Sequence, residues 1–210
     1  MAQAAQDLPQ DVSPDRFSIF EAPLQCPAAP EIGCGSRAKP ILLELERDSN
    51  VSEAWLNRAG TRIALVWKID STSDARRTVA AKLKKQDATE VAGKARDEAV
   101  AEFRSGKGWY RGTSVDRLSE EEAGIIAERL VRRIQVKTTL TGDNAAGLQR
   151  AIADALKKRF TDARAKENQD GLLKSEHGLQ EAAKPYLTED QIPILKGAIA
   201  SGLRPLPNEK

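Results

Sequence analysis

Apolar residues in the first ninety positions follow two different spacings. Four short runs alternate apolar with polar residues or are rich in β-branched residues, which predicts strands at 17–20, 51–57, 61–67 and 88–92. Two runs between them repeat apolar residues every three or four positions, which predicts helices at 36–47 and 74–86. The resulting order is β-α-β-β-α-β, the split βαβ arrangement of ferredoxin-like domains.

The pattern changes near residue 93, after which strand signals almost disappear. Helical periodicity and capping residues predict helices at 94–105, 119–134, 143–160 and 188–200. Ser119 and Glu122 have the spacing of a capping box, and the β-branched run 136–141 is a candidate strand. We therefore predict an α+β chain with three parts. These are a flexible lead-in (1–15), a ferredoxin-like βαββαβ domain (16–93) and a mostly α-helical domain (94–210).

Composition excludes several classes of protein. Hydrophobic residues make up 40% of the 210 residues, and the 14 glycines bring the apolar share to about 47%, near the roughly 45–50% of globular proteins. A disordered or collagen-like chain is thereby excluded. Lys and Arg number 33 against 31 Asp and Glu, and aromatic residues are only 4%. Neither the net charge of +2 nor the supply of stacking side chains indicates a nucleic-acid partner.

Hydropathy also bears on where the protein works. No run of 18 apolar residues occurs, so no membrane insertion is expected. The first fifteen residues lack both the basic start and the apolar stretch of a signal peptide. The sequence thus predicts a cytoplasmic protein. The alternative is a periplasmic protein, if the chain is a mature form whose signal peptide has been removed.

Both cysteines, Cys26 and Cys34, lie in residues 21–35, a stretch with three prolines and two glycines that we expect to be a loop. If the loop brings the two sulfurs together, the reduced pair offers two soft ligands and the oxidised pair is a disulfide. Arg37 and the start of a helix favour the thiolate form of Cys34. A structural or inert role for both cysteines is the third possibility.

Several spaced positions resemble the heavy-metal-associated domain of copper chaperones, mercury-binding proteins and metal-transporting ATPases. The segment 31–37, Glu-Ile-Gly-Cys-Gly-Ser-Arg, aligns with the Gly-Met-x-Cys-x-x-Cys metal loop of that family, with Glu31 at the position of its Gly and Ile32 at that of its Met. Ile41 and Leu45 then follow at the family's spacing, and 51–57, Val-Ser-Glu-Ala-Trp-Leu-Asn, aligns with its Gly-Val-x-x-Ala-x-Val-Asn strand. The resemblance extends over about residues 16–92, less than half of the chain.

This resemblance implies a binding protein for a soft metal, Cu(I) or Hg(II), that acts as a chaperone or resistance factor. Cys34 falls at the first metal cysteine, whereas Arg37 stands at the second, where its positive charge opposes a cation. Cys26 is the candidate for the missing thiolate, which makes Cys34 and Cys26 the predicted metal ligands. The alternative is an interaction or scaffold protein that keeps the ferredoxin-like fold with a degenerate metal site.

Other residues give weaker signals. His177 lies in a polar stretch and is interpreted as a solvated loop residue rather than a ligand. Trp55 and Trp67 are expected on sheet faces, packed against the helical half or forming a docking patch, and Trp109 is expected to anchor a loop. The motifs of phosphate-binding loops, dinucleotide sites, zinc proteases and serine hydrolases are absent, so an enzyme is the least supported option. We expect a protein partner, and the sequence gives no indication of the oligomeric state.

Overall fold

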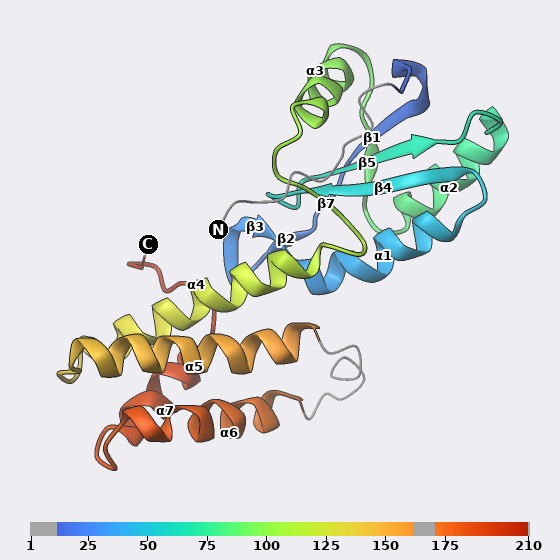
Figure 1. The fold of residues 1–210 in the computed structure, drawn as a ribbon. Coiled ribbons are helices and arrows are strands. Elements are labelled where there is room, and N and C mark those ends of the chain that lie inside the picture. The colour runs from blue at the N-terminus through green and yellow to red at the C-terminus, as the bar shows by residue number, and fades with distance from the viewer. Residues whose placement is uncertain (1–11, 162–170, 210) are drawn as a thin grey trace. The chain divides into compact units, whose positions relative to one another are not determined.

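A computed structural model describes residues 12–161 and 171–209 (Figure 1). Residues 1–11 of the predicted lead-in lie outside the described residues, and the short 3-10 helix η1 (Pro14–Arg16) precedes the first strand. The chain divides into two compact units. We call Met1–Cys26 with Pro30–Leu118 the sheet unit, and Pro27–Ala29 with Ser119–Lys210 the helical unit.

The sheet unit is built on five antiparallel strands in the order β6-β1-β5-β4-β7, which makes the chain a mixed α and β protein. The register at the centre of the antiparallel sheet places Ala64 opposite Ile19 on one side and opposite Trp55 on the other. The strands are β1 (Phe17–Glu21), β4 (Val51–Asn57), β5 (Arg62–Trp67), β6 (Thr89–Glu90) and β7 (Trp109–Arg111). All four strands predicted from the sequence are present, although the last is shorter than predicted.

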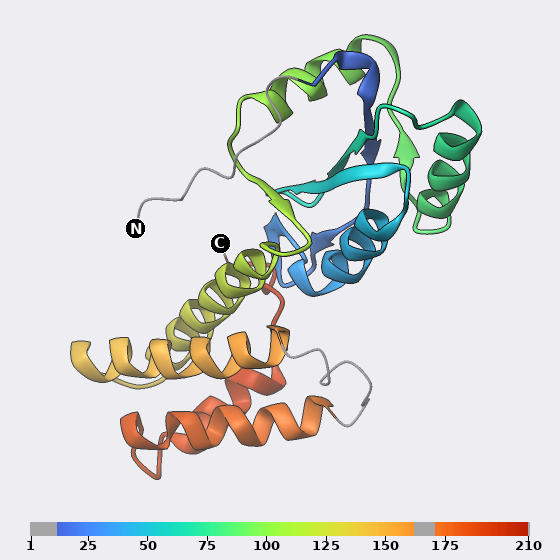
Figure 2. The ribbon, with the colours of Figure 1, turned by 45° about the vertical axis from the view of Figure 1, so that its right-hand side comes forward.

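Helices cover both faces of the sheet (Figures 1 and 2). Helices α1 (Gly35–Arg47) and α2 (Ser73–Lys84) share one apolar core with strand residues that include Trp67. Helix α3 (Gly93–Arg104) covers the opposite face, where the Phe103 ring meets Trp55 at a centroid distance of 5.8 Å and Trp109 at 5.0 Å. The three tryptophans are therefore buried within the sheet unit and do not form a docking patch. Trp55 packs against Phe103, which belongs to the first helix of the predicted helical half (94–210), whereas Trp67 packs in the core shared with α1 and α2.

The sheet unit extends to Leu118, beyond the boundary near residue 93 that the change in pattern predicted. Residues 94–105 form a helix as predicted, but Val100 and Phe103 pack on the sheet. Strand β7, which the sequence did not predict, pairs with β4 along Trp55–Asn57. The hydrophobic pattern of a helix shows that one side is buried without showing which surface buries it.

Residues 21–35 form a β-hairpin, so the prediction of an irregular loop was wrong. Strand β2 (Gln25–Cys26) pairs with β3 (Ala29–Gly33) in a separate two-stranded sheet. Proline is tolerated at an edge because an edge strand leaves some N–H groups outside the ladder. Pro30 therefore lies inside β3 without interrupting it.

The helical unit consists of four helices and one 3-10 turn among its described residues. These are α4 (Asp116–Gln135, which begins in the sheet unit), α5 (Gly142–Thr161), α6 (Gly171–Ala183), η3 (Lys184–Tyr186) and α7 (Ile192–Ala200). Their apolar sides, which include Leu130, Ile152 and Leu195, form one core. In the described parts of both units, no helix is long and apolar enough to cross a lipid bilayer.

Three local predictions in this region were wrong. Helix α4 begins at Asp116, three residues before the predicted cap Ser119, and Asp116 forms an ion pair with Lys39. Residues 136–141 connect two helices rather than forming a strand, with the Val136 side chain 86% exposed. His177 lies on helix α6 and not in a loop, although it is exposed as predicted.

Candidate functional site

The β2–β3 hairpin and the start of α1 bring the two cysteines together. Cys26 is the last residue of β2, and Cys34 follows β3 directly as the N-cap residue of α1. Both are free thiols with little exposed surface, 1% for Cys26 and 7% for Cys34. Their side chains lie within hydrogen-bond reach of each other, so that the Cys26 thiol can stabilise a thiolate at Cys34. The structure therefore joins the two residues that the sequence singled out.

A close approach of two glycines fixes the position of Cys34. A β-carbon on Gly33 would lie 2.9 Å from the Gly60 Cα, and one on Gly60 would lie 2.5 Å from both the Gly33 Cα and the Leu24 carbonyl oxygen. Gly60 has φ +70°, so the turn between β4 and β5 requires a residue that tolerates the left-handed region. Side chains at either position would force these backbones apart.

Backbone hydrogen bonds hold the same three segments together. Gly33 donates to the carbonyl of Arg58 at 2.7 Å, and Leu24 donates to the carbonyl of Gly60 at 2.9 Å. Cys34 donates to the carbonyl of Leu24, also at 2.7 Å. The thiol pair is thus attached to the β4–β5 turn, which itself belongs to the central sheet.

Several groups around Cys34 favour its thiolate form. The hydrogen bond from Cys26 is the largest influence that lowers the pKa of Cys34, and burial of the sulfur acts in the opposite direction. The Ser36 hydroxyl lies 3.4 Å from the Cys34 Sγ, and the backbone N–H and positive charge of Arg37 lower the pKa further. The helix dipole acts in the same sense, because Cys34 lies at the N-terminus of α1. Together these groups hold the pKa of Cys34 well below that of a free thiol.

The two sulfurs are not part of a larger cluster of metal-ligating side chains among the described residues. No group of three or more His, Cys, Asp or Glu side chains suited to a metal ion occurs among residues 12–161 and 177–209, whose side chains are described. His177 has a side chain that is 77% exposed and lies 3.9 Å from a carboxylate oxygen of Glu181 on the same helix. The Arg37 side chain is exposed, so the position of the family's second cysteine faces solvent. The arrangement suits chemistry that needs two thiols and no third ligand.

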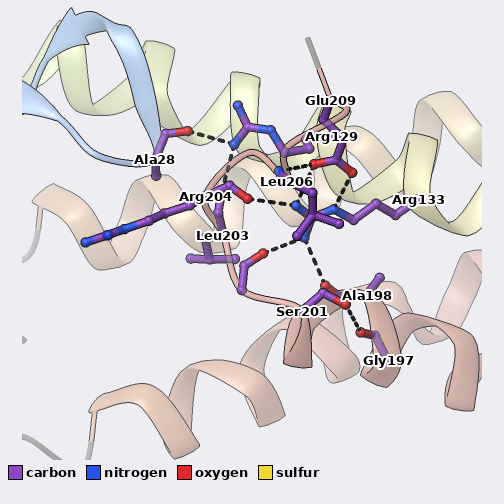
Figure 3. A network of polar contacts seen from close by, with 11 residues as sticks. Ala28, Arg129, Arg133, Gly197, Ala198, Ser201, Leu203, Arg204, Leu206 and Glu209 are labelled. Carbon is purple, nitrogen blue, oxygen red and sulfur yellow. Dashed lines mark hydrogen bonds and ion pairs between the residues drawn. The ribbon is translucent and has the colours of Figure 1, made fainter.

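A second polar cluster, which the sequence pattern did not predict, lies in the helical unit (Figure 3). Arg129 and Arg133 are one turn apart on α4 and are only 4% and 8% exposed. Arg129 donates to the carbonyls of Ala28 and Leu203, each at 2.7 Å. Arginine counts as polar in a hydrophobic pattern, but these two share the α4 side of the buried Leu130 and Ile126. This position on the apolar side of the helix was the sign in the sequence that the two arginines are buried.

Comparison of the chain with protein-family models, with curated proteins and with solved structures gave no match in any of the three searches. The resemblance of residues 16–92 to the heavy-metal-associated domain therefore depends on the spaced sequence positions alone. Any function has to be argued from the residues themselves.

Proposed function

We propose that the protein binds a soft metal ion, Cu(I) or Hg(II), between the sulfurs of Cys26 and Cys34, as a chaperone or resistance factor. The contact between the two thiols carries the proposal, since two sulfurs within hydrogen-bond reach of each other can share one ion. Soft cations of this kind prefer thiolate ligands and accept a coordination number of two.

The strand order of the sheet unit supports a ferredoxin-like domain as the scaffold that carries this site. Helix α1 connects β1 to β4, two strands that run parallel with β5 between them. Helix α2 likewise connects β5 to β6, with β1 between them. Each connection spans one intervening strand, which is the split βαβ arrangement. Strand β7 and helix α3 are additions to that plan.

The two cysteines would contribute differently to metal capture. Cys34 is the more exposed thiol and its pKa is lowered, so it would be the first ligand to take over an ion from a donor. Cys26 is buried and hydrogen-bonded to Cys34, so it would complete the pair once its proton has been released. Arg37 would offset part of the negative charge of two thiolates, since its charge acts on Cys34.

Anaerobic competition between the reduced protein and a colorimetric Cu(I) chelator tests the proposal. We expect one equivalent of Cu(I) bound, no stoichiometric binding by Cys34→Ser, and markedly weaker binding by Cys26→Ser. His177→Ala is the matched control, because it removes a possible copper ligand that lies on the other unit and should leave binding unchanged. Unchanged uptake by Cys34→Ser would place the metal elsewhere and end the proposal.

A second candidate function is an interaction protein that keeps the fold without the metal. The observation that favours it is Arg37, which occupies the position of the family's second cysteine with its side chain in solvent. Arg37→Cys distinguishes the two candidates. If the arginine disabled an intact metal loop, this variant gains tight Cu(I) binding over a non-binding wild type.

A further inference from the structure

A pocket of about 410 Å³ opens in the helical unit beside the last turn of α4. Arg132, Val136 and Lys137 line it from the end of α4 and the residues that follow. Leu206 and Glu209 line it from the segment after α7. All of its lining residues belong to one compact unit, so the pocket is a property of that unit alone.

The Arg133 guanidinium lies in one wall of the pocket. Figure 3 shows the polar contacts that hold it there. Its Nε and Nη2 atoms donate to the two carboxylate oxygens of Glu209 at 2.8 and 2.7 Å, a two-pronged ion pair. Its Nη groups also donate to the carbonyls of Ala198, Gly202 and Arg204, at the end of α7 and just beyond it. The segment 202–209 is thereby held against α4.

Positive charge exceeds negative charge around the pocket. Glu209 is the one acidic residue in the lining, and Arg133 engages both of its oxygens. The lining also contains Arg129, Arg132 and Lys137. The Arg132 guanidinium lies 3.9 Å from Glu128, with both side chains more than half exposed, and such exposed pairs contribute little stability. An incoming carboxylate would therefore meet a surface on which positive side chains predominate.

Apolar side chains are exposed at the same place. Of the large hydrophobic residues that are exposed in the described part of the chain, Ile69, Val136 and Leu206, two line this pocket. Val136 is 86% exposed and Leu206 is 40% exposed. Exposed apolar surface rimmed by charge is typical of sites that bind another protein.

We propose that this pocket docks an acidic peptide segment of a partner protein. Carboxylates of the segment would pair with Arg132 and Lys137, and a large apolar side chain would pack on Val136 and Leu206. The pocket lining contains no aromatic side chain on which a base could stack, which favours a peptide over a single-stranded nucleic acid. This proposal does not depend on the thiol pair.

Selection from a phage-displayed library of random dodecapeptides on the immobilised full-length, metal-free protein tests the inference. The charge-reversal variant Arg132→Glu/Lys137→Glu serves for counter-selection. We expect enriched peptides that combine Asp or Glu with a large apolar residue. A synthetic copy of the best peptide should bind the charge-reversal variant at least tenfold more weakly, and Val136→Ser severalfold more weakly.

The matched control is Lys94→Glu/Lys158→Glu, which reverses two exposed charges outside the pocket and should bind as the wild type does. Enrichment of peptides without acidic residues, or equal binding by the charge-reversal variant, would overturn the proposal. Failure to enrich any peptide that depends on Arg132 and Lys137 would overturn it too. Displacement of the peptide by a twelve-residue oligo-dT at lower concentration would show a phosphate site instead.

Discussion

The Arg133–Glu209 ion pair predicts that Glu209→Gln destabilises the helical unit in a pH-dependent way. Arg133 lowers the pKa of Glu209 from 4.5 to about 2. A carboxyl group whose pKa is lower in the folded than in the unfolded state stabilises the fold fully above the unfolded value. This stabilisation is lost as the pH falls from about 4.5 towards 2. The two proteins should therefore differ most at neutral pH and converge under acid.

The magnitude follows from the geometry of the pair. The displacement of the Glu209 pKa alone corresponds to roughly 3 kcal/mol. The Glu209 side chain keeps 24% of its exposure, and the Arg133 guanidinium retains three carbonyl partners without it. Solvent screening and these remaining bonds reduce the expected loss to about 1–2 kcal/mol at pH 7.

Urea denaturation followed by two probes measures this effect with an internal control. All three tryptophans lie in the sheet unit, so tryptophan fluorescence reports on that unit, whereas far-UV circular dichroism reports on both. We expect Glu209→Gln to move the unfolding transition of the helical unit, followed by circular dichroism, to a lower urea concentration at pH 7. The fluorescence transition, which reports on the sheet unit, should stay in place. An unchanged helical transition at pH 7, or an equal loss at pH 2.5, would refute the reasoning.

Three further predictions concern the sheet unit. Phe103→Ala removes a buried ring that makes edge contacts with Phe17, Trp55 and Trp109, and should cost about 3–5 kcal/mol in urea denaturation followed by tryptophan fluorescence. Gly60→Ala should lower the thermal midpoint and expose the thiols to Ellman's reagent, because its β-carbon would overlap backbone atoms; a midpoint equal to that of the wild type would contradict this. Cys34 should react with iodoacetamide at a pH below that needed by a free thiol, and Cys26→Ala, which has no side-chain donor, should move the Cys34 pH–rate profile to higher pH because the strongest influence that lowers the Cys34 pKa is removed.

Local periodicity was sufficient to locate most elements of the sheet unit. Strand 51–57 coincides with β4, and the helices predicted at 36–47 and 74–86 match α1 and α2 within two residues at each end. These elements bury one continuous apolar side or run, so spacing alone identifies them. The five-stranded antiparallel sheet is consistent with the predicted β-α-β-β-α-β order of elements. Strand β7 and the packing of α3 on the sheet depend on contacts between residues distant in the sequence, which local periodicity does not reveal.

The features that the sequence did not predict depend on contacts between distant residues. Strand β2 has two residues, too few for a visible alternation, and its partner β3 contains a proline. The pairing of Cys26 with Cys34 could be named as a possibility, but the hairpin that brings about their contact could not. The burial of Arg133 depends on the carbonyls and on Glu209, which lie 65 to 76 residues further along the chain.

The short edge strands of the central sheet limit how this protein can associate with itself. Its outermost strands, β6 and β7, contain two and three residues, whereas the inner strands contain five to seven. Each outer strand pairs with only part of its neighbour, so a chain that added to the sheet would meet a short and stepped edge, and short edge strands are one device that limits edge-to-edge aggregation.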